Sequence, residues 1–294
     1  NSLTRSEDPG SSQKRCGHAS AVDRPTAAGP PVGPYRGPPG LESADAKPVP
    51  PPAPRYPSLS HRPLCGAALM QPAQLLALLA AGEPLSGEAL AVAAGVTRAA
   101  IWKQVEALRR RGVPVEARGA AGYCLPWPLQ MLDAARIRAL LPASAASALT
   151  ALDVHWELDS TSSELQRRLA TAGDFSVVLA ETQHAGRGRR GREWLSPPGM
   201  NIYLSCLKRF DAGFAALTGL SLAVGVIALR ALEKLGIGGA GLKWPNDLLV
   251  APGKRNDGPG GKLGGILIEL SGEYQGPCAA IIGIGLNLRL TPAL

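Results

Sequence analysis

The sequence has few of the residues that build metal sites and disulfide frameworks. Its 294 residues include five cysteines and four histidines, and no two cysteines are spaced as a C-x-x-C pair. An odd number of scattered cysteines argues against a disulfide framework and against a cysteine-based zinc site. We therefore expect a protein of a reducing compartment, the cytoplasm.

Membrane-targeting patterns are scarce as well. The longest apolar run, residues 214–229, is interrupted by threonine, serine and glycine and is shorter than the roughly 18–20 residues that a membrane span needs. We expect this run to form a buried helix, and we expect no membrane partner. The N-terminal residues lack the succession of basic, apolar and small residues that is typical of a signal peptide.

Positive charge, in contrast, is in excess. Lysine and arginine together number 31 against 23 aspartates and glutamates, which gives a net charge of +8. Such an excess suits an anionic partner, whether nucleic acid, nucleotide or acidic protein, and does not choose among them. The length of the chain suits about two domains.

Proline is concentrated at the start of the chain. Fourteen of the 27 prolines precede Met70, which is the first methionine. Such a segment buries too little apolar surface to offset chain entropy, so residues 1–69 are predicted to be disordered. Two interpretations stay open: a polyproline-type linker or ligand segment, or sequence upstream of a native start at Met70. The second is favoured because helical periodicity begins abruptly there, and neither assigns a function.

Residues 70–134 carry three helical patterns followed by a short hairpin. Ser86 and Thr97 are suited to cap the second and third helices. On the third helix, Ile101, Val105 and Leu108 recur at the spacing of a buried stripe. With the glycine-rich hairpin at 113–125, the pattern predicts a winged helix-turn-helix domain.

The third helix of such a domain would enter the major groove of DNA. Arg98 and Lys103 lie off its buried stripe and are candidates for base or phosphate contacts. Arg118, on the hairpin, would contact the DNA backbone or the minor groove. The alternative is a solvated helical domain or one that contacts a protein.

The most basic stretch of the second half is G-R-G-R-R-G-R-E-W at residues 186–194. Glycines let a backbone approach a ligand closely, and arginines donate to phosphate or carboxylate, so we expect a mobile loop that closes over an anion. The stretch also matches the G-x-G-x-x-G dinucleotide fingerprint, which requires a helix to begin inside it. Pro197 and Pro198 follow too soon for that helix, so we reject the dinucleotide interpretation.

Four further motifs accompany this loop. They are D-S-T-S-S at 159–163, K-W-P-N-D at 243–247, G-K-L-G-G-I-L-I-E at 261–269 and G-I-G-L-N-L at 283–288. In this order and at these separations the set resembles the biotin–protein ligases. Together with the helix-turn-helix it resembles the bifunctional kind that is also the biotin operon repressor. The resemblance covers residues 70–294.

The resemblance implies an α+β fold, with a winged helix-turn-helix followed by a catalytic core related to class II aminoacyl-tRNA synthetases over residues 135–294. The residues favour a mixed sheet independently, because helices alternate with strand patterns. Those strand patterns lie at 154–158, 175–181, 201–206, 242–249, 264–270 and 279–286.

The activity implied is a two-step acyl transfer. Biotin and ATP, with Mg²⁺, give biotinyl-5'-AMP, and biotin then passes to a lysine of the biotin carboxyl carrier protein of acetyl-CoA carboxylase. The resemblance also implies operator DNA as a partner and a homodimer in the adenylate-bound state, whose two-fold symmetry would match paired half-sites.

Site residues are carried over by motif. Lys262, between glycines at the start of a strand, is the candidate to bridge the carboxylate and the α-phosphate, and Arg189 is the second catalytic candidate. The biotin-binding set is Ser160, Thr161, Ser162, Gln183, Arg187, Gly188, Arg189 and Lys262; the nucleotide-binding set is Arg187, Arg189, Trp194, Asn246 and Asn287; Asp247 is the candidate Mg²⁺ ligand. Ser162 departs from the asparagine usual in the family, which changes the hydrogen-bonding groups offered to biotin.

Two departures keep other functions open. Residues 251–260 are longer than the family's usual turn and suggest a flexible insertion, and the chain stops at Leu294, before the family's small SH3-like barrel. One alternative is a biotin-sensing repressor that ligates poorly. Another is a lipoate–protein ligase relative, although the arginine-rich loop, K-W-P-N-D and the helix-turn-helix favour biotin.

Overall fold

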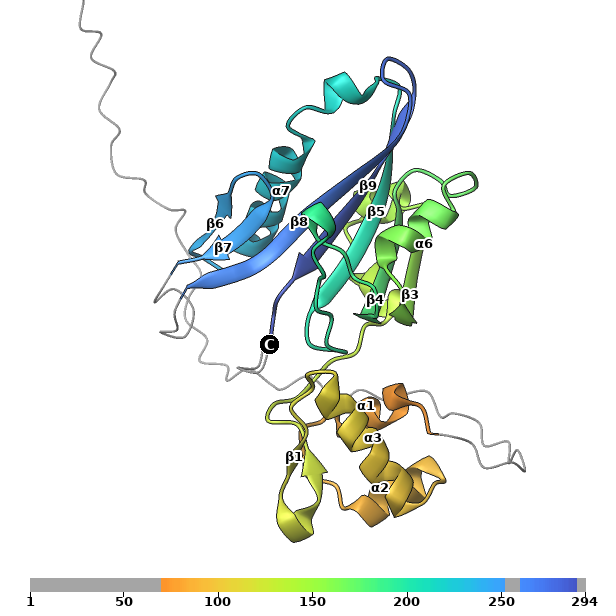
Figure 1. Cartoon of the computed structure of the whole chain (residues 1–294), viewed down its shortest axis with the longest axis vertical. Coiled ribbons are helices and arrows are strands. Elements are labelled where there is room, and N and C mark those ends of the chain that lie inside the picture. The colour runs from red at the N-terminus through yellow and green to blue at the C-terminus, as the bar shows by residue number, and fades with distance from the viewer. Residues whose placement is uncertain (1–69, 252–259, 290–294) are drawn as a thin grey trace, which may run out of the picture. The chain divides into compact units, whose positions relative to one another are not determined.

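A computed structural model of the chain describes residues 70–251 and 260–289 (Figure 1). The predicted disorder of residues 1–69 and nearly all of the predicted insertion lie outside these residues. The described residues belong to one unit of the chain.

Three short helices form the first domain. They are α1 (Pro72–Leu79), α2 (Gly87–Ala94) and α3 (Arg98–Arg110). The Ser86 hydroxyl accepts a hydrogen bond from the Ala89 N–H at 3.0 Å, and the Thr97 hydroxyl accepts one from the Ala100 N–H at 3.2 Å. These are the two predicted N-caps, and each pairs a backbone donor that the helix itself leaves unpaired.

A buried apolar cluster joins the three helices. Ile101, Val105 and Leu108, the predicted stripe of α3, are fully buried and pack with leucines of α1 and α2. Each such burial contributes about 1.5–3 kcal/mol, so the stripe fixes which face of α3 points inward. The outward face is exposed and carries Arg98 and Lys103.

The predicted hairpin follows α3. Its strands β1 (Glu116–Ala117) and β2 (Tyr123–Cys124) pair in antiparallel fashion, and the 3-10 turn η1 (Gly119–Ala121) joins them. Arg118 is exposed on this hairpin and forms an ion pair with Glu116 at 2.8 Å. Three helices and a hairpin confirm the winged helix-turn-helix.

A seven-stranded mixed sheet forms the second domain. Its strand order is β3-β4-β5-β9-β8-β7-β6. Only β3 and β4 run parallel, and the other neighbouring pairs are antiparallel, which confirms the predicted mixed sheet. The strands are β3 (Ala151–Leu158), β4 (Ser176–Gln183), β5 (Ile202–Phe210), β6 (Ala240–Lys243), β7 (Asp247–Val250), β8 (Gly261–Gly272) and β9 (Cys278–Leu286).

The register of the central strands decides which residues become neighbours. Gly283 on β9 stands opposite Ser205 on β5. Two positions further along β9, Gly285 stands opposite Tyr203 on β5 and Gly265 on β8. Because side chains of a strand alternate between its faces, these positions lie on one face of the sheet.

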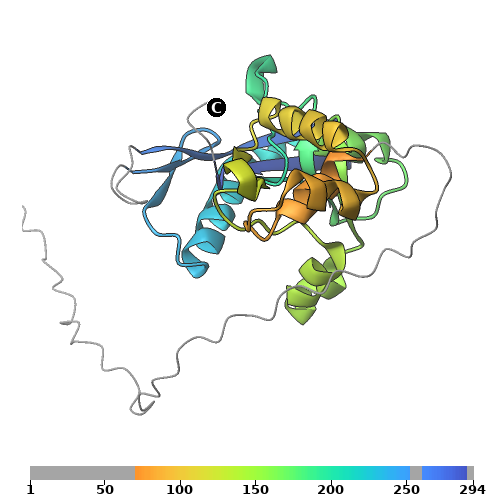
Figure 2. The same ribbon diagram turned by 90° about the horizontal axis from the view of Figure 1, so that it is seen from below.

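Short helical segments connect the strands. They are α4 (Ala134–Leu140) and α5 (Ala143–Ala148) before β3, α6 (Thr161–Arg167) after β3, η2 (Arg189–Gly191) after β4, and η3 (Phe214–Leu217) with α7 (Leu220–Lys234) after β5. Leu165 of α6 is buried against Val178, Leu207 and Ile281 of the sheet. α7 packs against β6, β7 and β8 (Figure 2).

The apolar run at 214–229 differs from its prediction. The helical segment Phe214–Lys234 has 21 residues and a mean hydropathy of 1.9, and only 17% of its most apolar window is buried. The expectation of a buried helix was therefore wrong, and the helical segment extends beyond the apolar run, to Lys234. Length and composition alone remain weak grounds for a membrane helix, because core helices pass the same test.

The single strand predicted at 242–249 is also wrong. The structure has two strands there, β6 and β7, paired in antiparallel register from Ala240↔Val250 to Lys243↔Asp247. The physical reason is Pro245, which has no N–H for a sheet ladder, so Trp244, Pro245 and Asn246 form the turn between the strands.

Candidate active site

The predicted motifs come together around one pocket of about 470 Å³. Its lining includes Ser160–Ser162 at the start of α6, Gln183 at the end of β4, residues 187–190 and 192–194, residues 243–247, Lys262 on β8, and 283–285 on β9. These segments are far apart in the sequence. The antiparallel packing of β5, β9 and β8, with α6 above them, brings them to one place.

Hydroxyl and amide groups form one end of the pocket. The Thr161 and Ser162 hydroxyls lie 2.8 Å and 3.0 Å from the Ser205 hydroxyl, and all three residues are buried. The Gln183 carbonyl accepts from the Thr161 N–H at 2.9 Å, and its amide donates to the Ser196 hydroxyl at 3.2 Å. We call Thr161, Ser162, Gln183 and Ser205 the polar floor. It offers both donors and acceptors to a neutral polar ring.

Ser205 did not figure in the sequence prediction. It sits within the apolar strand pattern at 201–206, where a lone serine gives little local sign of a ligand site. Its completely buried position beside Thr161 and Ser162 is a result of the register of β5.

The indole of Trp194 lies flat against the sheet over two glycines. A Cβ at Gly285 would stand 2.5 Å from two indole carbons, and one at Gly265 would stand 3.0 Å from a third. Real Cβ atoms do not approach as closely as 2.5 Å, so Gly285 must be glycine for the ring to occupy this place. A Cβ at Gly265 would require the ring to shift by a few tenths of an ångström. Trp194, predicted at the nucleotide, thus forms part of the pocket wall.

The ring and a carboxylate hold the ammonium group of Lys262. Its Nζ lies 2.9 Å from Asp247 Oδ1 and 5.2 Å from the centre of the Trp194 ring. A cation is attracted both to a carboxylate and to the face of an indole. Asp247 therefore orients Lys262 in this structure, while its predicted role as a Mg²⁺ ligand stays a prediction.

The arginine-rich loop folds back on itself. The Gly188 N–H donates to the Arg192 carbonyl at 2.7 Å, and the Trp194 N–H donates to the Gly186 carbonyl at 2.9 Å. Arg190 and Gly191 turn the chain with positive φ angles of 60° and 71°.

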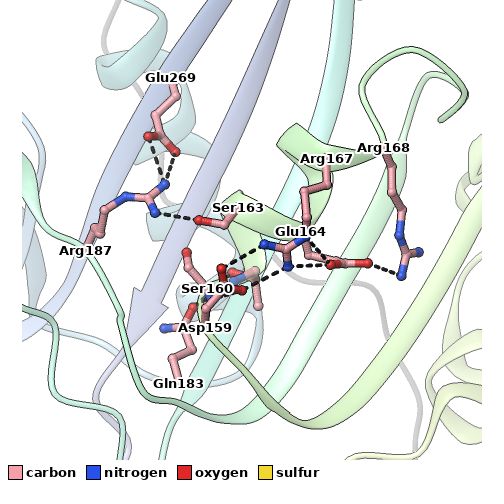
Figure 3. A network of polar contacts seen from close by, with 10 residues as sticks. Asp159, Ser160, Ser163, Glu164, Arg167, Arg168, Gln183, Arg187 and Glu269 are labelled. Atoms are coloured by element: carbon pink, nitrogen blue, oxygen red, sulfur yellow. Dashed lines mark hydrogen bonds and ion pairs between the residues drawn. The ribbon is translucent and has the colours of Figure 1, made fainter.

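Two arginines of this loop reach across the pocket. The Arg189 guanidinium donates to the Asn246 side-chain oxygen at 3.0 Å, and the Asn246 amide donates to the Ile266 carbonyl at 3.0 Å. Arg187 forms an ion pair with Glu269 on β8 (Figure 3). The arrangement keeps both predicted arginines at the pocket.

Asn287 is the predicted site residue that the pocket lining does not include. Its amide donates to the Lys262 carbonyl at 3.1 Å, and its N–H donates to the Leu263 carbonyl at 2.7 Å. It thereby fixes the backbone that carries the lysine.

Charge is unevenly distributed in the lining. Six basic side chains face two acidic ones, namely Arg187, Arg189, Arg190, Arg192, Lys243 and Lys262 against Glu193 and Asp247. A concave site with such an excess concentrates anions. Within residues 70–251 and 260–289, no group of three or more His, Cys, Asp or Glu side chains could hold a metal ion.

An ion-pair network stabilises the start of α6, which carries the hydroxyls of Thr161 and Ser162. The Arg167 guanidinium donates to both Asp159 oxygens at 2.8 Å and 2.9 Å, and to Glu164 (Figure 3). The hydrogen bonds from Arg167 are the main reason that the pKa of Asp159 is lowered to about 2. Asp159 also accepts from the Ser160 N–H at 2.8 Å, which fixes the chain at the entry to α6.

Comparison with known proteins agrees with this geometry. Residues 157–287 match the model of the biotin/lipoate A/B protein ligase family, and residues 73–124 match an HTH domain. By these matches the first part of the chain is similar to helix-turn-helix domains and the second part to the biotin/lipoate A/B protein ligase family.

Individual relatives combine the same two parts. The chain is 41% identical over 219 residues to the bifunctional ligase/repressor BirA of Escherichia coli K12 and to that of Salmonella typhimurium LT2. These 219 residues are 74% of this chain and 64% of each relative. It is 40% identical over 139 residues to the biotin–[acetyl-CoA-carboxylase] ligase of Paracoccus denitrificans, which is 46% of this chain and 53% of the relative. The chain thus spans less than two thirds of the length of these relatives.

The Trp194–glycine packing predicts a steric penalty. Gly285→Ala should lower the free energy of unfolding by about 1–3 kcal/mol, the usual range for overpacking, because the new methyl group overlaps the indole. Gly241→Ala on β6 is the control, since its Cβ would meet no atom within 4 Å. Urea denaturation measures both. Adding Trp194→Ala to Gly285→Ala should remove the extra steric cost. Equal stabilities of Gly285→Ala and Gly241→Ala would contradict the packing argument.

The Asp159–Arg167 pair predicts a pH-dependent stability. The lowered pKa of Asp159 contributes stability above the ordinary aspartate pKa, and this contribution is lost as the pH falls through about 2. Asp159→Asn should therefore cost about 1 kcal/mol at neutral pH, discounted because the pair is partly exposed. The difference in the free energy of unfolding between Asp159→Asn and the parent should shrink as the pH is lowered from neutrality. Asp211→Asn, at an exposed position, should lack this behaviour; a deficit that is constant with pH would argue against the pair.

Proposed function

We propose that this chain is a biotin–protein ligase and a DNA-binding repressor. In the first step an oxygen of the biotin carboxylate attacks the α-phosphorus of ATP, which forms biotinyl-5'-AMP and expels pyrophosphate. In the second step a lysine amine of the carrier protein attacks the biotinyl carbonyl and expels AMP. The carrier lysine loses a proton in forming the amide bond.

The first step brings a carboxylate to a polyphosphate, so it depends on cations fixed in advance. Lys262 is held between Asp247 and the Trp194 ring, and Arg189 is held by Asn246. We assign Lys262 to the attacking carboxylate and the α-phosphate, and Arg189 to the phosphate side. The hydrogen bond from Asn287 to the Lys262 carbonyl supports an indirect role for Asn287.

The polar floor is the observation that favours biotin over lipoate. Biotin carries a ureido ring with two N–H donors and one carbonyl acceptor, which can pair with the hydroxyls and with Gln183. The dithiolane ring of lipoate has neither group and would leave Thr161, Ser162 and Ser205 without ligand partners. These buried hydroxyls already bond to one another in this structure, so a ureido ring would add hydrogen bonds here that a dithiolane ring cannot make.

The loop and Trp194 would keep water from the adenylate. A mixed anhydride is labile to hydrolysis, and a closed, water-poor site protects it. The loop crosses the pocket through Arg187 and Arg189, which contact β8 and the β6–β7 turn. Gly188, in the same loop, lines the pocket and leaves room for the ligand.

Mg²⁺ enters this proposal as part of the nucleotide substrate. Mg²⁺ is commonly bound by one or two carboxylates together with phosphate oxygens. Asp247 is the carboxylate that lies beside Lys262, and its oxygen is engaged at 2.9 Å by the ammonium group. No step of the reaction is assigned to a protein-held metal.

The partners follow from the two domains. We propose the biotin carboxyl carrier protein of acetyl-CoA carboxylase as the acceptor and operator DNA as the ligand of the winged helix-turn-helix. An adenylate-bound homodimer, whose two-fold axis would match paired half-sites, completes the repressor proposal. A cytoplasmic location is supported by Cys124, Cys206 and Cys278, which are free thiols in the described part of the chain.

The second candidate is a biotin-sensing repressor with little ligase activity. The presence of a helix-turn-helix domain and of the pocket in one chain supports it. The pocket itself would serve either function, because both bind biotin and its adenylate.

The ligase proposal predicts attachment of biotin to a carrier domain by the full chain with ATP and Mg²⁺. Lys262→Ala should lower the rate about 10²–10³-fold, the usual cost of losing one preorganised electrostatic contact. Lys234→Ala, at the exposed end of α7, is the matched control. Labelled biotin on the carrier is the measurement. Adenylate without transfer would support the sensing repressor, transfer of lipoate instead of biotin would support the lipoate relative, and neither product would refute the enzyme.

The repressor proposal predicts salt-sensitive DNA binding through α3. Arg98→Ala and Lys103→Ala should each weaken binding to a labelled mixed-sequence duplex and reduce the salt slope by about 1, because each removes one phosphate contact. Fluorescence anisotropy at several salt concentrations gives both values. Arg136→Ala on α4 is exposed and lies outside the helix-turn-helix, so it should bind like the parent. Equal losses in all three variants would mean that α3 is not the contacting surface.

A further inference from the structure

The first arginine of the loop already has two partners on two different elements. The Arg187 guanidinium donates from Nη2 to both oxygens of Glu269, at 3.0 Å and 3.1 Å, and from Nη1 to the Ser163 hydroxyl at 2.5 Å. Figure 3 shows Arg187 between Glu269 on β8 and Ser163 on α6. We call Arg187, Ser163 and Glu269 the loop clasp.

The position of the clasp connects the two ends of the pocket. Ser163 follows Ser162 of the polar floor, and Glu269 lies on β8, the strand that carries Lys262. Across the loop, the backbone of Arg187 pairs with the backbone of Glu193 in an isolated antiparallel β-bridge. Contact of Arg187 with α6 and β8 therefore fixes the base of the loop relative to both groups of site residues.

The two pocket-spanning arginines differ in how their positive charge is compensated. A carboxylate neutralises Arg187, whereas Arg189 is held by the neutral amide of Asn246. Both hydrogen bonds to the Glu269 carboxylate come from Nη2, and hydrogen bonds between two charged groups are stronger than neutral ones. Arg187 is thus already committed to a partner inside the protein, while the charge of Arg189 stays available to an anion.

We propose that Glu269 is a positioning residue that holds the arginine-rich loop over the pocket by fixing Arg187. In this role Arg187 acts through the loop, and Arg189 is the arginine that meets the ligand. The inference about the ligand rests on the proposed function, but the loop-holding role does not. It can therefore be tested without substrate.

Trypsin reports on the loop directly, because it cleaves after arginine. Limited digestion of the full chain, followed by mass spectrometry, gives the rate of cleavage after Arg189 and Arg190, neither of which belongs to the clasp. Glu269→Gln should raise this rate roughly two- to five-fold, which matches the coupling measured for partly exposed ion pairs. Glu269→Asp, which keeps the charge, should fall between the parent and Glu269→Gln.

Glu273→Gln is the matched control. Glu273 lies just after β8 in the same hairpin, is exposed, and has no ion pair among the described residues. Its replacement should leave the cleavage rate unchanged. Circular dichroism spectra like that of the parent would establish that each variant is folded. A folded Glu269→Gln variant cleaved at the parental rate would overturn the proposal.

A double-mutant cycle tests whether Arg187 and Glu269 affect the cleavage rate together or independently. If Glu269 works only through Arg187, then Arg187→Ala combined with Glu269→Gln should be cleaved no faster than Arg187→Ala alone. A double variant in which the two increases multiply would overturn the proposal.

A second readout links the clasp to the ligand. With biotin and ATP present, Glu269→Gln should release biotinyl-5'-AMP several-fold faster than the parent and the Glu273→Gln control, because the loop opens more often. Unchanged release with faster proteolysis would overturn the ligand part of the proposal and leave the loop-holding role supported. If no adenylate forms in the parent, the proposed function fails, and the digestion result still decides the loop-holding role.

Discussion

The site depends on one packing contact, the indole of Trp194 against two adjacent strands that have no side chain at the point of contact. Gly265 and Gly285 stand opposite each other in the β8–β9 ladder, and the ring fills the space above them. The ring in turn lies under the ammonium group of Lys262. Because Trp194 also ends the arginine-rich loop, this single contact sets the positions of the sheet, the loop and the central cation relative to one another.

Charge compensation is the second constraint. The pocket gathers six basic side chains, and like charges at this density repel one another. Asp247 and Glu269 each neutralise one of them, and Asn246 orients a third without neutralising it. The partners are partly exposed, so these ion pairs are individually weak. A carboxylate or a phosphate can therefore compete for the same cations.

The two domains use positive charge in different ways. On α3, Arg98 and Lys103 are exposed on the face opposite a fully buried stripe, which suits contact with an extended polyanion. In the pocket, by contrast, cations are oriented by specific partners, which suits a small ligand of fixed geometry. The same excess of lysine and arginine in the composition thus divides between an exposed helix face and a concave pocket.

Much of this could be predicted from the sequence, because the governing interactions are local or follow the chain. Ser86 and Thr97 cap helices within three residues of themselves, the 3.6-residue period marks the stripe of α3, and the order of the motifs indicates the family. Pro245 divides 242–249 into two strands for an equally local reason, although the apolar pattern alone suggested one. Only the tertiary structure decided which distant residues meet. Ser205 joins the floor, Glu269 meets Arg187, and Asn287 supports Lys262 from outside the pocket, because strand register and packing set these contacts.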